Sequence, residues 1–144
     1  MKLSVNERQK GFVATNTQSI LEAYATVSEG NVALPFAIYH DGELIGFVMF
    51  GYGTIGEEDE PQVADGNYCI WRLMIDRKYQ GRGYGKKAMK AALAYLQTKP
   101  CGEANFCWLS YEPENSVARA LYSSLGFMEN GEKSGDEIVA VRRL

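Results

Sequence analysis

A glycine-rich loop between a predicted strand and a predicted helix is the stretch best suited to chemistry. It reads Gln80-Gly81-Arg82-Gly83-Tyr84-Gly85 and is followed at once by Lys86 and Lys87. The first N–H groups of a helix have no partner within the helix, and the helix dipole adds partial positive charge there, so a helix start attracts anions. Glycines allow a ligand to approach the backbone closely, and the basic side chains add full charges. The stretch therefore predicts a phosphate-binding loop.

A second candidate feature is the pair Asn115 and Tyr122, which lies in another predicted helix. The two residues are seven positions apart, so at about 3.6 residues per turn they share one helix face. Arg119 lies near the same face. The phenol of Tyr122 could donate a proton to a leaving group. It could equally be a core side chain whose hydroxyl reaches the surface, and the spacing leaves both readings open.

A rival glycine motif, G-x-G-x-x-G, occurs at Gly51 to Gly56 after a predicted strand. A dinucleotide-binding motif needs a helix next, because the helix start holds the pyrophosphate. Four acidic residues and Pro61 follow instead. The acids would repel a phosphate and the proline would disturb a helix. We therefore predict a strand that runs into a loop, not a dinucleotide site.

Composition narrows the class of protein. The chain has 144 residues, 46% of them hydrophobic and 23% charged, with a net charge of −3. We predict one domain, residues 1–144, with a sizeable core. The negative charge argues against a general nucleic-acid binder. No run approaches the roughly 18 apolar residues of a membrane span, so we expect no membrane partner.

The cysteines and the single histidine exclude further classes. The three cysteines are odd in number and form no C-x-x-C motif, so we expect reduced thiols and a cytoplasmic protein. His40 is the one histidine, which excludes a multi-histidine metal site. We expect no metal.

The elements that must position these residues follow from hydrophobic periodicity and turn signals. The glycine loop sits between a strand and a helix, and a second strand after that helix should be parallel to the first. Asp41-Gly42 predicts a hairpin turn. Helices are predicted at 16–29, 83–98 and 113–125, and strands at 34–40, 44–52, 68–75, 104–110, 127–130 and 137–143.

These motifs resemble the GNAT N-acetyltransferase superfamily. Its acetyl-CoA signature, Q/R-x-x-G-x-G/A after a strand, is matched by Gln80, Gly83 and Gly85. Its second signature is matched by Asn115, Tyr122 and the step Leu125-Gly126-Phe127. The stretches W-R-L-M-I-D, Y-Q-G-R-G-Y-G-K-K and Y-E-P-E-N look more narrowly like the bacterial spermine/spermidine acetyltransferase branch. The match runs from about Leu34 to Leu144.

The resemblance implies an α+β fold with three layers. Its sheet would be mixed and mostly antiparallel, with helices on its faces. The strand at 68–75 would splay from the parallel strand at 104–110, and acetyl-CoA would lie in the split. The backbone of Leu73, Met74 and Ile75 would pair with pantetheine, and a bulge there would turn one N–H, of Met74 or Ile75, toward the thioester oxygen. The implied cofactor-binding residues are Leu73, Met74, Ile75, Gln80, Gly81, Arg82, Gly83, Tyr84, Gly85, Lys86, Asn115, Arg119 and Tyr122.

The resemblance also implies a reaction, in which a primary amine attacks the thioester directly and Tyr122 gives a proton to the departing thiolate. Reference pKa values of about 8.5 for a thiol and about 10 for a phenol make that transfer plausible. The amine must first lose a proton, and no residue is an obvious base. Glu112, Glu58 and Glu60 are the candidates near the substrate.

The acidic loop from Glu57 to Glu60 bears on which amine is used. It is either a solvated loop or a negative field that concentrates a polycation such as spermidine. Tyr52, Tyr68 and Trp71 could line the substrate pocket. Trp71 and Arg72 should face opposite sides of their strand, because side chains alternate. Alternatives to a small-amine acetyltransferase are a peptide N-terminal or protein lysine acetyltransferase and a non-catalytic acyl-CoA-binding module.

The chain departs from the family pattern at its start. The family begins with a strand and a complete helix before the region of Gly11-Phe12, whereas Met1 falls within what should be that helix. Either the start lies upstream, the chain is a fragment, or this member lacks the first strand. Loss of that strand would leave the strand at 34–40 as an open edge. We therefore expect a homodimer.

Overall fold

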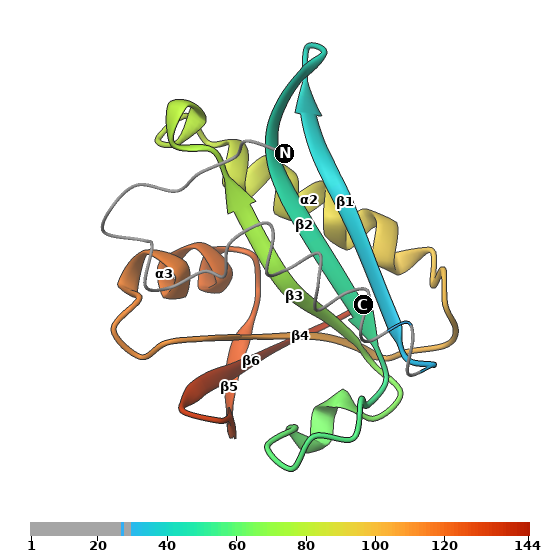
Figure 1. Cartoon of the computed structure of the whole chain (residues 1–144). Coiled ribbons are helices and arrows are strands. Elements are labelled where there is room, and N and C mark those ends of the chain that lie inside the picture. Colours follow the sequence, from blue (N-terminus) through green and yellow to red (C-terminus); the bar gives the residue numbers. More distant parts are fainter. Residues whose placement is uncertain (1–26, 28–29) are drawn as a thin grey trace.

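A six-stranded mixed sheet organises the part of the chain that the computed structural model describes, residues 27 and 30–144 (Figure 1). The strand order is β1-β2-β3-β4-β6-β5, and every neighbouring pair is antiparallel except β3 and β4. The predicted α+β architecture with one parallel pair is therefore confirmed. The strands are β1 (Val32–His40), β2 (Glu43–Tyr52), β3 (Tyr68–Ile75), β4 (Phe106–Tyr111), β5 (Met128–Ser134) and β6 (Glu137–Arg143).

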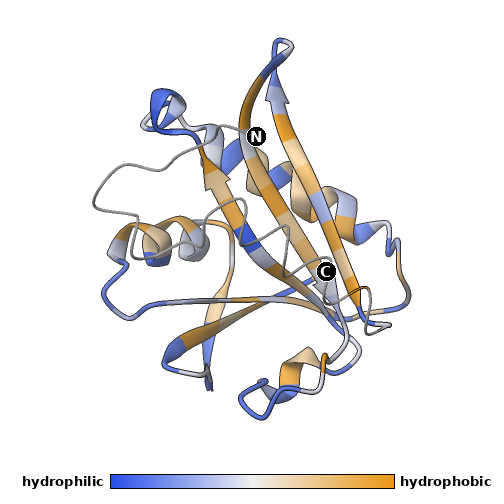
Figure 2. Ribbon diagram, viewed as in Figure 1, coloured by the Kyte–Doolittle hydropathy of each residue, from blue (hydrophilic) through white to orange (hydrophobic). Residues whose placement is uncertain are grey.

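Two complete α-helices in the described part flank the sheet, α2 (Tyr84–Gln97) and α3 (Ser116–Ser124). Short 3₁₀ helices at Gln62–Ala64 and Arg77–Tyr79 lie in the loops on either side of β3. Apolar side chains of α2 spaced three and four apart, from Met89 to Leu96, are buried with β2, β3 and β4 in the main core. Figure 2 shows that β2 and β3 are largely hydrophobic, whereas α2 carries both hydrophobic and hydrophilic residues. The helix expected at 16–29 lies, apart from Val27, outside the described residues.

The sheet opens between β3 and β4, as predicted. The two strands pair over only two positions, Tyr68 with Cys107 and Cys69 with Trp108. Beyond these pairs β4 continues along β6 while β3 continues along β2. Figure 1 shows β3 and β4 diverging, with α3 beside the opening. This divergence leaves backbone groups of β3 without a strand partner on one side.

A bulge in β3 corrects two of the predictions. Phe50 pairs with Ile70 and Met49 pairs with Arg72, so Trp71 is an extra residue in β3. The bulge expected at residues 73–75 therefore lies at Trp71 instead. The expectation that Trp71 and Arg72 face opposite sides is also wrong, because an extra residue interrupts the alternation of side chains, and both line one cavity.

The strand β1 is the end strand of the described sheet and pairs there with β2 alone. The homodimer expected from an open edge stays a prediction. Within residues 27 and 30–144, no helix has the length and hydrophobicity needed to cross a membrane. All three cysteines are free thiols, as predicted.

Candidate active site

A cavity of about 310 Å³ lies at the opening between β3 and β4, and we call it the split cavity. Three segments that are distant in sequence form it: the end of β3, the glycine loop with the start of α2, and one face of α3. Its lining residues are Leu73, Met74, Ile75, Tyr79, Gln80, Gly81, Gly83, Tyr84, Gly85, Asn115, Val117, Ala118, Leu121 and Tyr122. The split thus brings together the two motifs that the sequence analysis singled out.

The glycine loop has the backbone of an anion site. Gly81 and Gly83 have φ values of 73° and 79°, a region that favours glycine. Gly83 is the N-cap of α2, and its carbonyl accepts the hydrogen bond from the Lys87 N–H. The N–H groups of residues 84–86 therefore have no partner within the helix. The Gln80 side chain donates to the Ile75 carbonyl at 2.8 Å and ties the loop to the end of β3.

The backbone of β3 presents alternate residues to the split. The Asp76 N–H donates to the Ile45 carbonyl of β2 at 2.7 Å, so Asp76 faces β2. Because successive residues of a strand direct their backbone groups to opposite sides, those of Ile75 face the split. Of the two expected oxyanion donors, Met74 and Ile75, this alternation favours Ile75.

The second motif folds as the start and end of α3. Asn115 is the N-cap, and its side-chain oxygen accepts a hydrogen bond from the Ala118 N–H at 3.2 Å. Gly126, with φ 86°, follows the helix end as predicted. Two turns after Asn115, the ring of Tyr122 lies 5.8 Å from that of Tyr111. This packing fixes the phenol at the wall of the split cavity.

The phenol of Tyr122 is a weaker acid than a free tyrosine. Burial, followed by the negative charge of Glu137 and then by Tyr111, raises its pKa to about 12. Within the described residues its hydroxyl makes no hydrogen bond. The group therefore stays protonated at neutral pH, and its O–H can be directed to a ligand in the cavity.

Three of the expected cofactor-binding side chains do not line the split cavity. Arg82 and Lys86 are exposed beside it. Arg119 lies elsewhere: its Nε donates to Glu129 of β5 at 2.8 Å, and Tyr111 donates to the same carboxylate oxygen at 2.7 Å. Arg119 thus joins α3 to β5. The remaining expected residues all line the cavity.

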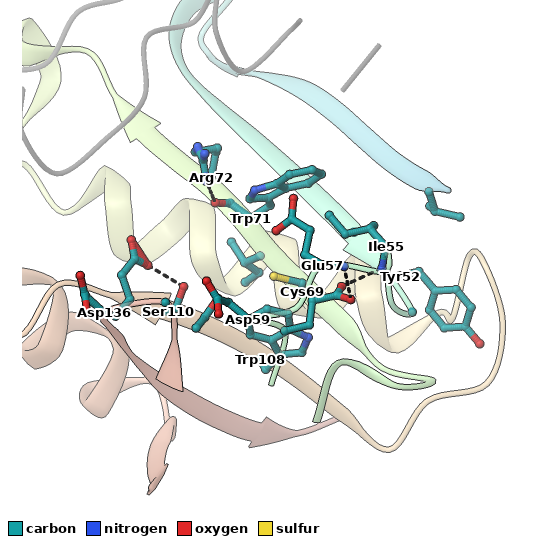
Figure 3. A pocket seen from close by; sticks show the side chains of 18 residues that line it. Tyr52, Ile55, Glu57, Asp59, Cys69, Trp71, Arg72, Trp108, Ser110 and Asp136 are labelled. Atoms are coloured by element: carbon teal, nitrogen blue, oxygen red, sulfur yellow. Dashed lines mark hydrogen bonds between the residues drawn. The ribbon is translucent and has the colours of Figure 1, made fainter. Parts of the chain in front are cut away.

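A second cavity, of about 390 Å³, lies where the front of the sheet meets two turns, and we call it the acidic cavity (Figure 3). Its walls come from β3, β4, the loop after β2 and the turn between β5 and β6. Its charged and aromatic lining residues are Tyr52, Glu57, Asp59, Glu60, Trp71, Arg72, Trp108, Asp136 and Glu137. Five carboxylates face one arginine, so the cavity is electrostatically suited to a cation.

The acidic loop supplies part of this wall and also stabilises itself. Glu60 accepts hydrogen bonds from the N–H groups of Ile55, Gly56 and Glu57 at 2.7, 2.9 and 3.2 Å. No α-helix follows Gly56, so this glycine motif lacks the context of a dinucleotide site, as predicted. The loop is therefore both an ordered turn and a source of negative field.

Among the expected substrate residues, Glu60 and Trp71 line the acidic cavity, whereas Glu58 and Glu112 do not. The expectation for Tyr68 is wrong. Its side chain is fully buried in the core, and its hydroxyl donates to the Gly102 carbonyl at 2.9 Å. The even positions of β3 before the bulge face the core, which explains the difference.

The sequence analysis missed the part of the cavity that β4 and the final hairpin supply. Residues 134–136 were predicted as a turn and Glu137 as the start of the last strand, although the adjacent acids Asp136 and Glu137 were a visible signal. Ser110 donates to Glu137 at 2.6 Å. Trp108 is 8% exposed, and its buried Nε1 has no hydrogen-bond partner among the described residues. Among residues 27 and 30–144, no group of three or more side chains is arranged to hold a metal ion.

Comparison with known proteins agrees with this arrangement. The model of the acetyltransferase (GNAT) family matches residues 6–127. The spermine/spermidine N(1)-acetyltransferase of Bacillus subtilis is 32% identical over 133 residues, which cover 92% of this chain and 81% of that protein. A ribosomal protein bS18-alanine N-acetyltransferase of Haemophilus ducreyi is 33% identical over 58 residues, 40% of this chain and 38% of that protein.

Solved structures show the same fold. Aminoglycoside acetyltransferase AAC(6')-Ib in complex with coenzyme A and kanamycin aligns with a TM-score of 0.74 at 20% identity, over 96% of this chain and 83% of that one. The PaiA N-acetyltransferase of Thermoplasma acidophilum in complex with coenzyme A aligns with a TM-score of 0.63 at 18% identity, over 90% of this chain and 72% of that one.

Proposed function

The chain belongs to the acetyltransferase (GNAT) family, and from this premise we propose that it acetylates a primary amine of a small polycation such as spermidine. It is an acetyl-CoA-dependent N-acetyltransferase. The polyamine is the proposed part. The observation that carries it is the acidic cavity, whose five carboxylates lie beside Trp71 and Trp108. The similarity to the Bacillus enzyme supports the same substrate class.

The residues of the split cavity fit acetyl-CoA. The helix start at Tyr84 offers N–H groups for the pyrophosphate, and exposed Arg82 and Lys86 lie beside them. The free edge of β3 can pair with the amide groups of pantetheine as a further strand would. Acetyl-CoA supplies the electrophilic carbonyl and the thiolate leaving group. The N–H of Ile75 then stabilises the negative charge that develops on the carbonyl oxygen.

Tyr122 serves as the donor to the leaving sulfur. Its pKa of about 12 exceeds the value of about 8.5 for a free thiol, so complete transfer of its proton would be unfavourable. The phenol can pass a proton on only if it regains one in the same step. The attacking nitrogen, which must lose a proton as the amide forms, provides it. Tyr122 is therefore proposed as a relay and hydrogen-bond donor.

A polyamine carries several positive charges and can present them to both acidic walls of the cavity at once. The loop from Glu57 to Glu60 forms one wall and the turn at Asp136 and Glu137 forms another, with Trp71 and Trp108 in the same cavity. Aromatic faces attract ammonium groups. A single-charge amine would meet one wall at a time, so we expect weaker binding of monoamines than of polyamines.

A thiol-release assay with acetyl-CoA tests the proposal. The acceptor panel contains spermidine, a linear monoamine of similar length, an aminoglycoside, and peptides with a free N-terminus or a lysine. We expect the highest kcat/KM for spermidine, with a KM that rises with salt because the attraction is screened. Preference for the peptides would favour a peptide or protein acetyltransferase. Tight acetyl-CoA binding without turnover of any amine would instead favour a binding module.

A further inference from the structure

Resting on the proposed function, we propose that Glu137, oriented by Ser110, receives the reacting ammonium and takes its first proton. The sequence offers Glu58, Glu60 and Glu112 as candidates for the general base. Glu60 accepts three hydrogen bonds within its own loop, and Glu58 and Glu112 do not line the acidic cavity. The Ser110–Glu137 pair lies at a different point of the fold.

The position of the pair follows from the strand registers. The pairing of β3 with β4 ends at Trp108, so Ser110 lies on β4 two residues beyond it, where the sheet has opened. Glu137 is the first residue of β6 and pairs with Ser134 across the hairpin. Both side chains line the acidic cavity, and Figure 3 labels Ser110 there. The hairpin thus brings a carboxylate to the opening.

One oxygen of this carboxylate is available to a ligand. The Ser110 hydroxyl donates to Oε2 of Glu137 at 2.6 Å. Within residues 27 and 30–144, Oε1 accepts no hydrogen bond and Glu137 makes no salt bridge with an arginine or lysine. Ser110 therefore holds the carboxylate in one orientation and leaves Oε1 for an ammonium group.

The negative charge of Glu137 affects the pKa of one residue in each cavity. It raises the pKa of Tyr122 at the split cavity, where burial is the larger cause. It also contributes to raising the pKa of Cys69 in the acidic cavity, after burial and Cys107. Of the acidic-cavity carboxylates, Glu137 alone contributes to the shift at Tyr122 in the described part. Glu137 lines the acidic cavity, and its hydrogen-bond partner Ser110 lies where β3 and β4 have separated, so the carboxylate is beside the opened part of the sheet.

Other charged groups face the same cavity from three directions. Arg72 comes from β3, Asp136 from the hairpin, and Asp59 from the loop after β2. Arg72 is held by its own neighbour, with Nη1 donating to the Trp71 carbonyl at 2.9 Å. These groups set the field around Glu137, but none of them makes a hydrogen bond to Ser110, which is the contact that orients the base.

The proposed step balances in atoms and charge. The ammonium gives one proton to the Glu137 carboxylate and becomes a neutral amine. Its lone pair forms the C–N bond with the thioester carbon as the C–S bond breaks. The nitrogen loses its second proton, which reaches the CoA sulfur through Tyr122. Glu137 releases the first proton to solvent through the acidic cavity, so ammonium and acetyl-CoA yield acetamide, CoA thiol and one proton.

The decisive comparison is Glu137→Gln against Asp136→Asn. Each removes one negative charge from the same cavity, and the glutamine keeps an oxygen that can accept from Ser110. For each variant, kcat and KM for spermidine are measured between about pH 6 and about pH 10. We expect Glu137→Gln to lower kcat at least about 100-fold at neutral pH. Asp136→Asn should raise KM with kcat within about twofold of wild type, because it weakens attraction only.

The pH profile and a weakly basic acceptor amine show whether Glu137 acts as a general base or only makes a structural contact. Without the base, neutral amine comes from solution alone, so kcat of Glu137→Gln should rise about tenfold per pH unit below the amine pKa. A primary amine that is already neutral at pH 7 should lose far less activity. A Glu137→Gln variant that changes KM alone, or whose deficit is the same for both acceptors, would overturn the inference.

Thermal unfolding and acetyl-CoA affinity show whether Glu137→Gln folds. If it does not fold, Ser110→Ala provides a second variant. Ser110→Ala should lower kcat about tenfold, and its kcat should rise with pH in the same way as that of Glu137→Gln. An unchanged kcat would contradict the orienting role of Ser110. The wild-type panel decides the proposed function separately. If the wild type prefers another primary amine to spermidine, the polyamine proposal fails, and the same comparison with that amine still decides the role of Glu137.

Discussion

Trp71 and Arg72 are adjacent in sequence, yet both line the acidic cavity, and the Arg72 guanidinium carbon lies 5.9 Å from the centroid of the Trp71 ring. The bulge at Trp71 produces this arrangement, because an extra residue in β3 places two successive side chains on one face. The bulge therefore gives the cavity an aromatic wall and its one arginine. It lies two residues before the stretch of β3 that lines the split cavity.

Replacing Tyr122 with phenylalanine should lower turnover more than cofactor affinity. The variant removes the donor to the leaving sulfur but keeps the ring that packs on Tyr111. We expect kcat to fall about 100-fold while the Kd for acetyl-CoA, measured by calorimetry, changes less than about threefold. Unchanged turnover would remove Tyr122 from the mechanism.

The pH dependence of the wild type should show no loss of activity from Tyr122 between pH 7 and about pH 10. The donor is the protonated phenol, which persists below a pKa that burial raises to about 12. A basic limb of the kcat profile that is present in the wild type and absent from Tyr122→Phe would contradict this assignment. Stopped thiol-release assays over that range provide the measurement.

Gly83→Val should abolish acetyl-CoA binding. A valine at φ 79° is strained by about 1–2 kcal/mol, and its side chain would occupy the space that the loop leaves open for a ligand. Gly131→Val is the matched control, since Gly131 has φ 85°, also has open space, and lines neither cavity. We expect similar losses of Tm in both variants and a loss of affinity in Gly83→Val alone, by thermal shift with acetyl-CoA. Equal affinities of the two variants for acetyl-CoA would show that the glycine loop does not bind the phosphate groups.

Glu57→Gln should raise the KM for spermidine about threefold or more, whereas Glu58→Gln should leave it unchanged. Both residues belong to one loop and both variants remove one charge, but Glu57 lines the acidic cavity and Glu58 does not. The effect of Glu57→Gln should shrink at high salt, because screening already weakens the attraction of the wild type. Equal effects of the two variants would indicate a general loop field instead of a lined site.

Gly46→Ala should destabilise the protein and weaken cofactor binding together. A Cβ at this position would clash with the Met74 carbonyl oxygen of β3, so β3 must shift where its edge faces the split. We expect a loss of about 1–3 kcal/mol in the free energy of unfolding, measured with urea, and a higher Kd for acetyl-CoA. Lost stability with an unchanged Kd would show that the β3 edge does not hold the cofactor.

Glu129→Gln should reduce the loss of stability in acid. Hydrogen bonds from Tyr111, then from Arg119, lower the pKa of Glu129. A carboxyl whose pKa is lower in the folded state stabilises the fold above the unfolded value of about 4.3, and this contribution is lost as pH falls through the folded value. The difference in Tm between neutral pH and about pH 3 should therefore be smaller in the variant than in the wild type. An equal difference would contradict the linkage.

The sequence by itself determined the elements and the two motifs. The boundaries of β3 and β6 agree with the predicted strands to the residue. The glycine loop, Asn115 and Tyr122 could be predicted because their chemistry is local: a glycine with positive φ, an N-cap and two positions on one helix face depend on neighbours within a few residues.

Tertiary structure alone decided where the acidic cavity, the proposed substrate site, lies. The bulge at Trp71 depends on the pairing of β3 with β2, and the pair Ser110 and Glu137 depends on the pairing of β4 with β6, twenty-seven residues apart. Such registers are set by packing between distant segments, which no local pattern records. The same packing buried Tyr68, paired Arg119 with Glu129 outside the split cavity, and raised the pKa of Tyr122 chiefly through burial.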